Sequence, residues 1–441
     1  MTAYWCEYAV VGTAEVRPGV LVEVRDRLIS SVTPNSAPGS AERLAGLTIP
    51  GLANCHSHAF HRALRGRTQR GTGSFWAWRE QMYALAGALD PDSYHRLARA
   101  VYREMAAAGI TSVGEFHYLH HDRDGSPYAD ANVMGSALVA AAGDAGIRIA
   151  LLDTCYLTAG FGKPPHGVQQ RFSDGDADAW QTRAAALSAQ AGRDVVIGAA
   201  AHSVRAVPEA ALRVVAGWAR STGVPLHVHL SEQVAENDEC HAAQGCTPTE
   251  LLDAAGYWGE LTTAVHATHL TRSDIGLLAQ GGATACICPT TERDLGDGIG
   301  PARQLEQAGV AITLGSDSHA VIDPYEEMRA LELDERLASS TRGNWSAAAL
   351  FQAGTATGHA SLGFPDAGQI RVGARADLVT LDLASMRTAG GGATLETAVF
   401  CAGSADVVQV VCEGRVIATR GGQAEVGREL AAAVDAVWQQ A

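Results

Sequence analysis

Short apolar segments alternate along the chain with polar loops and with alanine-rich stretches of helical periodicity. Between residues 48 and 319, eight apolar segments end in polar residues. Their nearly continuous apolar character is typical of strands buried on both faces, as in a parallel sheet. The segments are TIPGLANCHSH (48–58), GITSVGEFHY (109–118), IRIALLDTCY (147–156), DVVIGAAAHS (194–203), VPLHVHLSE (224–232), TTAVHATHL (262–270), ATACICPTT (283–291) and VAITLGSDSH (310–319).

Amphipathic helical segments lie between these strands. Examples are PDSYHRLARAVYREMAAAG and PEAALRVVAGWARSTG, each ending at glycine, the residue that most often terminates a helix. Eight strand–helix units predict an α/β fold, a (β/α)8 TIM-type barrel. In such a barrel the loops after the strands form the active site, and this is where the polar residues of this chain occur.

Both ends of the chain show a different sequence pattern, in which turn residues separate short predicted strands. Residues 4–50 show it, and GQIRVGARADLVTLDL and AVFCAGSADVVQVVCEGRVIA resume it before a helix from about Val426. We expect one small β-sandwich domain built from both termini. The predicted division is residues 1–49 and 369–441 for the β domain with its terminal helix, and residues 50–368 for the barrel.

Composition narrows the possible partners and the compartment. The 441 residues carry a formal charge of −15 without any basic run, which argues against nucleic acid or an anionic membrane as partner. A small anionic substrate remains possible if a few arginines are placed locally. Nine cysteines without compact spacing indicate reduced thiols, and no signal peptide or apolar run of membrane-spanning length is evident. We therefore expect a cytoplasmic protein.

Histidines and one carboxylate stand at the ends of several predicted strands. His56 and His58 alternate on the first strand, so both imidazoles face the same way. His229 ends the fifth strand, His266 the sixth and Asp317 the eighth. Histidine nitrogens with one carboxylate oxygen suit Zn²⁺ or Fe²⁺, with a position left for water.

These motifs resemble a known family. The pattern PGLxNxHxH, HVHLSE, HATH, GSDSH and GxxADLVxxD is similar to the deaminase-like branch of the amidohydrolase superfamily. Longer motifs resemble the formimidoylglutamate deiminases of histidine breakdown. These are FWAWREQMY (75–83), EFHYLHHDRDG (115–125), AAHSVRAV (200–207), HLSEQ (229–233), VHATHL (265–270) and CPTTERDLGDGIGPA (288–302).

The resemblance implies one divalent metal ion, with zinc expected ahead of iron. Binuclear members of the superfamily use a carboxylated lysine on the fourth strand, but the only lysine here, Lys163, lies in a loop. A single metal is therefore expected. Carried over by position, its ligands would be His56, His58, His229 and Asp317.

The implied reaction is the hydrolysis of N-formimidoyl-L-glutamate to N-formyl-L-glutamate and ammonia. Hydroxide generated at the metal would attack the amidine carbon, with Asp317 at the metal. His266 would assist proton removal, and Glu232, three residues after His229, would protonate the departing nitrogen.

The resemblance also implies residues that bind the substrate carboxylates. Arg79, Tyr118, His202 and Arg205 match binding positions of the family, and arginine forms bidentate bonds with carboxylates. His61 stands where the family commonly has Gln, which makes it a candidate for altered specificity.

Other histidines and one aspartate receive a plainer interpretation. His117, His120 and His121 are expected to be loop residues and residues behind the site that do not converge. His319 is expected to orient its neighbours. Asp294, where Asn is frequent in the family, is a second departure that could change specificity.

Several alternatives stay open at this point. The substrate could be another formimidoyl amino acid, a nucleobase or other heterocycle, or a cyclic amide. The chain could also be a ligand-binding homologue without catalysis, although the complete residue set argues against that. A homodimer is expected.

Overall fold

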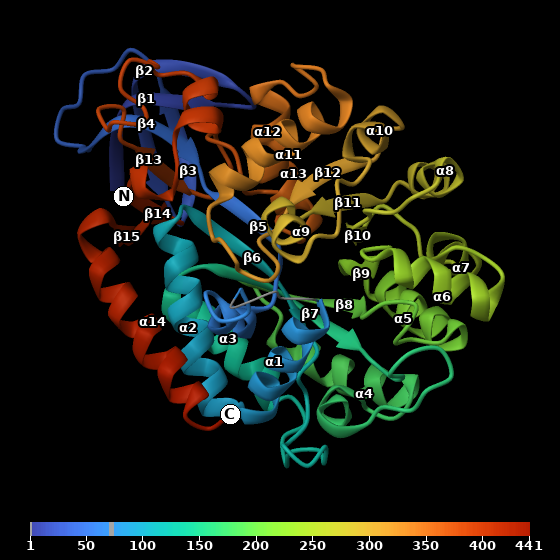
Figure 1. Cartoon of the computed structure of the whole chain (residues 1–441). Helices are drawn as coiled ribbons and strands as arrows, with labels where there is room; N and C mark the ends of the chain where they lie inside the picture. The colour runs from blue at the N-terminus through green and yellow to red at the C-terminus, as the bar shows by residue number, and fades with distance from the viewer. Residues whose placement is uncertain (1, 70–74) are drawn as a thin grey trace.

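Eight consecutive parallel strands form one sheet (Figure 1). The computed structural model describes residues 2–69 and 75–441, and for residues 75–77 it describes the backbone alone. The sheet closes where Ser57 pairs with Asp317, so it is the predicted barrel. The strands are β5 (Leu52–Ser57), β6 (Ile110–His117), β7 (Arg148–Cys155), β8 (Val195–Ala201), β9 (Leu226–Leu230), β10 (Thr262–His266), β11 (Thr284–Ile287) and β12 (Ala311–Leu314).

The helices between and after these strands cover the outside of the barrel (Figure 1). Local sequence sets their ends: in α2, Asp90 and Ser93 form a capping box with Pro91 in the first turn, and α5 ends at Gly223 in the left-handed region. Within the described residues, no helix is long and apolar enough to cross a bilayer. The helices are α1 (Phe75–Ala88), α2 (Pro91–Ala107), α3 (Val133–Ala145), α4 (Ala177–Leu187), α5 (Glu209–Thr222), α6 (Val234–Gln244), α7 (Pro248–Ala254), α8 (Arg272–Gly281), α9 (Pro289–Leu295), α10 (Ala302–Gln307), α11 (Pro324–Ser339), α12 (Ala347–Gly354) and α13 (Ala356–Ser361).

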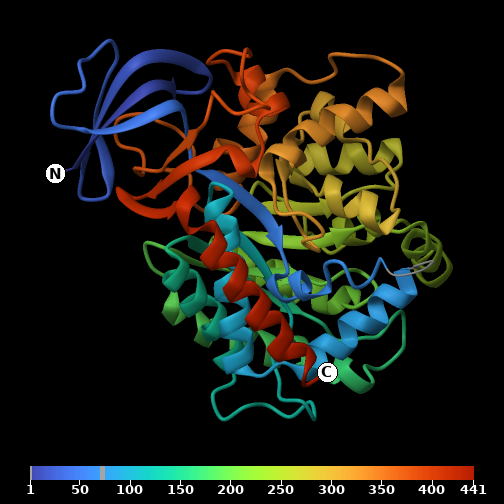
Figure 2. The ribbon, with the colours of Figure 1, turned by 60° about the vertical axis from the view of Figure 1, so that its left-hand side comes forward.

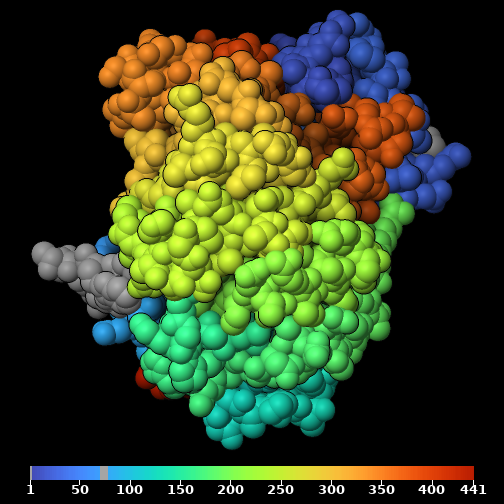
Figure 3. All heavy atoms as spheres, turned by 90° about the vertical axis from the view of Figure 1, so that its right-hand side faces the viewer, coloured from blue at the N-terminus to red at the C-terminus, as the bar shows by residue number. Residues whose placement is uncertain are grey.

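The two ends of the chain build the predicted β domain together. Its strands join in one seven-stranded mixed sheet, in the order β15-β14-β13-β4-β1-β2-β3, instead of two separate sheets. Figure 2 shows the N-terminal strands, in blue, beside the C-terminal ones, in red and orange, and in Figure 3 the atoms of the two ends likewise lie side by side. The strands are β1 (Thr2–Val11), β2 (Glu15–Arg25), β3 (Leu28–Thr33), β4 (Glu42–Pro50), β13 (Leu378–Leu381), β14 (Val407–Cys412) and β15 (Arg415–Thr419).

The last helix, α14 (Gln423–Trp438), returns to the barrel and lies along α2 (Figure 1, Figure 2). The Glu429 carboxylate pairs with Arg99 and Arg103 of α2, and the Trp438 indole N–H donates to the Ala63 carbonyl at 2.8 Å. The C-terminal helix therefore holds the segment that follows the first barrel strand.

A buried ion pair joins the barrel to the β domain. Arg148, at the start of β7, pairs with Asp377, and each is only 1% exposed. Arg148 Nε also donates to Ser112 Oγ at 3.0 Å, and Asp377 Oδ1 accepts from the Glu413 backbone N–H at 2.9 Å. Since removal of one member would leave a buried charge without its partner, this pair is expected to matter for stability.

Candidate metal centre and active site

The barrel closes at the residues predicted to hold a metal. The Asp317 backbone N–H donates to the His56 carbonyl at 3.0 Å, and the His58 N–H donates to the Asp317 carbonyl at 3.3 Å. Gly315 permits this approach, because a Cβ there would lie 2.8 Å from the His56 Cβ. Asp317 itself has a φ of 37°, a strained conformation of the kind that gathers at functional sites.

Three imidazoles and one carboxylate converge at this closure. Asp317 Oδ1 lies 3.3 Å from His56 Nε2 and 3.4 Å from His58 Nε2. His229 Nε2 lies 3.1 Å from His56 Nε2. The structure thus brings together the four predicted ligands, and all four are buried. Within this cluster, His266 lies as close to His56, His229 and Asp317 as a metal ligand would, and His58 groups with His61 and Asp317.

These residues fit a divalent cation on chemical grounds. The Nδ1 atoms of His58 and His229 lie 2.9 Å from the carbonyls of Phe116 and His202, so each ring donates there and turns the Nε2 lone pair inward. His56 Nδ1 is buried without a hydrogen-bond partner among the described residues, and the Nε2 atoms of His56 and His229 face each other at 3.1 Å.

The protonation states agree with this reading. Burial lowers the pKa of His56, of His58 and of His229, which favours the neutral imidazoles that metal ligation requires. Burial alone would raise the pKa of Asp317, but the neighbouring imidazoles, His56 first, hold that pKa below its ordinary value. The set offers three neutral nitrogens and one ionised carboxylate.

His266 and Glu232 lie beside this cluster. His266 Nε2 is 3.9 Å from Glu232 Oε1 and 3.8 Å from Asp317 Oδ2. On its other side, His266 Nδ1 is 3.3 Å from Glu292 Oε1, which also accepts the Cys288 backbone N–H at 2.8 Å. Glu292, on α9, therefore holds the ring from behind, a contact that the sequence did not predict.

Burial and charge oppose each other at this pair. Burial lowers the pKa of His266, but Glu232, Glu292 and Asp317 together raise it well above its ordinary value. Burial raises the pKa of Glu232, and the His266 charge partly offsets that rise. Both groups therefore bind a proton more readily than the free side chains do, which suits residues that take part in proton transfer.

A hydrogen-bonded layer lies behind the cluster. Ser57 Oγ donates to Glu115 Oε2 at 2.6 Å and lies 3.0 Å from His319 Nε2, whose Nδ1 lies 2.9 Å from Ser316 Oγ. Burial raises the pKa of Glu115 to about 7. His319 thus links β5 to the loop after β12, as expected of a residue that orients its neighbours.

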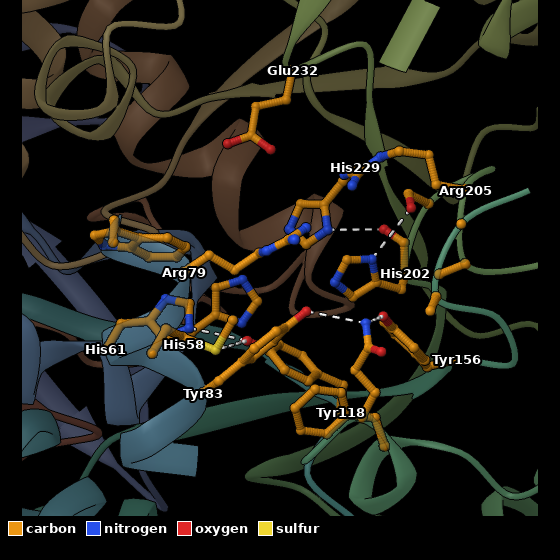
Figure 4. Close-up of a pocket in the computed structure, with 18 of the residues that line it drawn as sticks. His58, His61, Arg79, Tyr83, Tyr118, Tyr156, His202, Arg205, His229 and Glu232 are labelled. Carbon is orange, nitrogen blue, oxygen red and sulfur yellow. Dashed lines mark hydrogen bonds between the residues drawn. The ribbon is translucent and has the colours of Figure 1, made fainter. Parts of the chain in front are cut away.

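All five predicted substrate-binding residues line one pocket together with His229, Glu232, His266 and Asp317 (Figure 4). His61 Nε2 lies 3.0 Å from the Tyr118 hydroxyl, and Arg205 Nε donates to Glu236 Oε2 at 3.1 Å. Figure 4 shows Glu232 at one end of the pocket and the tyrosines at the other. The predicted binding residues are His61, Arg79, Tyr118, His202 and Arg205.

One expectation about nearby residues needs correction, and the effect of Asp294 on specificity stays a prediction. Asp294 is exposed and accepts from Gln69 Nε2 at 2.9 Å, so its carboxylate faces the surface. The rings of His117 and His120 do converge, with centroids 4.7 Å apart, and His121 Nε2 lies 3.3 Å from Asp174 Oδ1. All three histidines are buried and form a packed group behind the loop after β6.

Sequence reasoning also missed part of the pocket wall, including two tyrosines and a glutamine. Tyr83 comes from α1, Tyr156 follows β7, and Gln169 lies in the short helix η2 (Gly167–Phe172). Tyr156 could have been found, because it ends the third predicted strand. Gln169 gave no signal, since its segment lacks periodicity.

Comparison with known proteins places the chain in a family. The model of the Amidohydrolase family matches residues 47–417. A formimidoylglutamate deiminase of Pseudomonas aeruginosa is 36% identical over 96% of this chain and 95% of its own length. A 5-methylthioadenosine/S-adenosylhomocysteine deaminase of Halobacterium salinarum is 28% identical over 92% of this chain and 91% of its own.

Solved structures agree with this assignment. The crystal structure of an amidohydrolase from Brucella melitensis has a TM-score of 0.91 and 31% identity, covering 99% of this chain and 100% of that one. The family is metal-dependent, and the buried histidines and aspartate described above are arranged as such a site requires. The chain therefore belongs to the amidohydrolase family, as a hydrolase of C–N bonds.

Proposed function

We propose that this enzyme hydrolyses N-formimidoyl-L-glutamate to N-formyl-L-glutamate and ammonia, a reaction of histidine degradation. One observation carries the proposal: the pocket is acidic at one end and rich in donors at the other. Glu232 and Asp317 suit the basic formimidoyl group, and Arg79 and Arg205 suit carboxylates. The relative that is 36% identical over 96% of the chain supports the same substrate.

In this proposal His56, His58, His229 and Asp317 would hold one divalent ion, with zinc favoured by the three imidazoles and one carboxylate. When bound, the ion acts as a Lewis acid that lowers the pKa of a water molecule to about 7. The carbonyls of Phe116 and His202 keep two of the rings oriented for this task.

In the proposed reaction, His266 and Glu232 carry out the proton transfers. His266, held by Glu292, takes a proton from the attacking water or stabilises charge on the tetrahedral adduct. Glu232, with its pKa raised by burial, gives a proton to the departing nitrogen. Arg205, fixed by Glu236, orients a carboxylate.

The remaining expectations stay part of the proposal. We expect a homodimer that acts on a small anionic substrate, without nucleic acid or membrane as partner. A cytoplasmic location is supported by nine free cysteines, which suit a reducing compartment. Light scattering after size-exclusion chromatography tests the dimer.

Ammonia release from four compounds tests the function, with metal quantified on the same sample. The compounds are N-formimidoyl-L-glutamate, N-formimidoyl-L-aspartate, guanine and cytosine. We expect turnover of the first to exceed that of the others by a factor of at least about 100. Turnover of a nucleobase alone would refute the proposal, and an inactive protein with little bound metal would indicate a binding homologue.

A further inference from the structure

Two tyrosines and a glutamine meet at the end of the pocket away from Glu232 (Figure 4). Gln169 Nε2 lies 3.1 Å from the Tyr83 hydroxyl and 2.9 Å from the Tyr156 hydroxyl. Tyr83 lies on α1, Tyr156 follows β7, and Gln169 lies in η2, so three separate elements supply the group. The mechanism proposed above gives none of the three a role.

The Gln169 amide has a defined direction. Its Oε1 accepts the backbone N–H of His166 at 3.3 Å, which turns Nε2 toward the two tyrosines. An amide nitrogen can only donate, so both phenol oxygens act as acceptors here. Gln169 is 4% exposed, so its amide is shielded from water, whereas Tyr83 is half-buried.

The direction of these bonds leaves two donors free. Each phenol oxygen receives a hydrogen from Gln169, and its own O–H has no acceptor among the residues that the structure describes. Burial raises the pKa of Tyr156, so its hydroxyl keeps the proton at neutral pH. Tyr83 and Tyr156 thus offer two O–H donors to whatever occupies the pocket.

Two arginines line the pocket near these tyrosines. The Arg79 guanidinium lies 5.6 Å from the centre of the Tyr83 ring, and Arg205 lines the pocket nearby. Two hydroxyl donors beside two guanidinium groups form a site for an anionic oxygen group.

The His202 ring lies between the four predicted metal ligands and Tyr156. The His202 ring centre lies 5.1 Å from that of His229 and 4.9 Å from that of Tyr156. The tyrosine therefore lies two ring contacts away from the cluster. In an extended N-formimidoyl-glutamate, the five bonds from the amidine carbon to the distal carboxyl carbon span roughly 6 Å.

The group is held in place from behind. Arg171, two residues after Gln169, is fully buried and donates to the carbonyls of Ala86 and Leu89 at the end of α1 and just beyond it. It also donates to the His121 carbonyl at 3.0 Å. Because η2 and α1 are tied together, the Gln169 and Tyr83 side chains are organised before a ligand arrives.

We propose that Tyr83, Tyr156 and Gln169 form a subsite for the distal carboxylate of the substrate. The inference rests on the proposed function and sharpens it, because it selects an acid with the length and terminal charge of glutamate. The two tyrosines would contact the carboxylate. Gln169 would be a positioning residue that keeps both hydroxyls turned outward as donors.

The test compares two substrates of equal length, N-formimidoyl-L-glutamate and N-formimidoyl-L-glutamine, with the zinc-loaded full-length enzyme. Tyr83→Phe and Tyr156→Phe should each lower kcat/KM for the glutamate compound about 10- to 100-fold, with less than about threefold change for the glutamine compound. Tyr8→Phe, at a half-buried tyrosine of β1 outside the pocket, is the control and should change neither.

Gln169→Glu is the sharpest variant because it keeps the size of the side chain. Its carboxylate would draw both tyrosine hydrogens to itself and repel an anion, so the preference for glutamate over glutamine should fall by at least about 100-fold. Proportional losses for both substrates in all three variants would mean a purely structural role. An unchanged preference would also overturn the inference.

Binding of glutarate, measured by calorimetry, separates this inference from the proposed function. Glutarate has two carboxylates but no amidine, and Gln169→Glu should weaken its binding at least about 30-fold. If the wild-type enzyme releases no ammonia but this loss occurs, the proposed function fails and the subsite stands. If the enzyme is active and Gln169→Glu leaves the affinity for glutarate unchanged, the proposed subsite is wrong and the proposed function stands.

Discussion

Glu292 is expected to decide which nitrogen of His266 faces the pocket. Its Oε1 lies 3.3 Å from His266 Nδ1, so a hydrogen on Nδ1 directs the Nε2 lone pair toward Glu232 and Asp317. Replacing Glu292 by Gln retains an acceptor oxygen but removes the charge. Replacing it by Leu removes both.

The structure sets the size of each effect. A hydrogen bond to a charged group contributes about 1.5–3 kcal/mol, and the length of 3.3 Å places this one near the lower limit. Glu292→Gln should therefore reduce kcat about tenfold. Glu292→Leu also leaves the buried His266 N–H unpaired, which adds about 1–3 kcal/mol, so kcat should fall about 100-fold or more.

Steady-state ammonia release, with zinc measured in each preparation, checks this reasoning. KM should change less than about threefold, because Glu292 does not line the pocket wall and acts through His266. Zinc content should stay constant, since Glu292 lies behind His266 and not among the four predicted ligands. Glu260→Gln, at an exposed carboxylate, is the matched control. A rise in KM with unchanged kcat, or a loss of zinc that parallels the loss of activity, would refute the assigned role.

Three further predictions concern the metal and stability. Chelation of divalent metal should abolish ammonia release and lower the melting temperature by about 5–10 °C, with zinc restoring both; activity that survives complete removal would contradict the metal assignment. Arg148→Met should lower the free energy of unfolding in urea by about 3–5 kcal/mol, because it leaves the buried Asp377 carboxylate without its partner. The double variant with Asp377→Leu should recover much of that loss. If Arg148→Met were as stable as the wild type, the ion pair would contribute nothing. Burial alone would raise the pKa of Asp174, but His121 and Arg183 lower that pKa below its ordinary value. The ionised Asp174 carboxylate therefore stabilises the fold above pH ~4, and this contribution is lost as the pH falls below that. Asp174→Asn should reduce the dependence of the free energy of unfolding on pH in the acid range, and an unchanged dependence would contradict this.

The sequence predicted the barrel and the family because both depend on local patterns. Strand ends carry the polar residues, and the eight apolar segments set the order of the sheet. The β domain was predicted from its short strands and turn residues alone, but the order in which its strands pair could not be predicted. Its central pairing joins β4 to β13, which lie more than three hundred residues apart and carry no local sign of partnership.

The five residues singled out at strand ends also came together for a geometric reason. Parallel strands in a closed barrel end on one face, so His56, His229, His266 and Asp317 had little freedom to lie elsewhere. Alternation on a single strand likewise placed His58 beside His56.

The pocket wall lacks such a constraint, and that explains the omissions. Tyr83 and Gln169 lie on α1 and η2, which are joined by the Gln169–Tyr83 hydrogen bond and by the buried Arg171 guanidinium with its carbonyl partners. No periodicity in the sequence reports a contact of this kind. Barrel geometry therefore makes the predicted metal ligands easy to find in a chain of this family. Substrate choice, in contrast, depends on segments whose positions are set only by tertiary contacts. The choice between glutamate and other acids is accordingly a question for α1 and η2 more than for the strand ends.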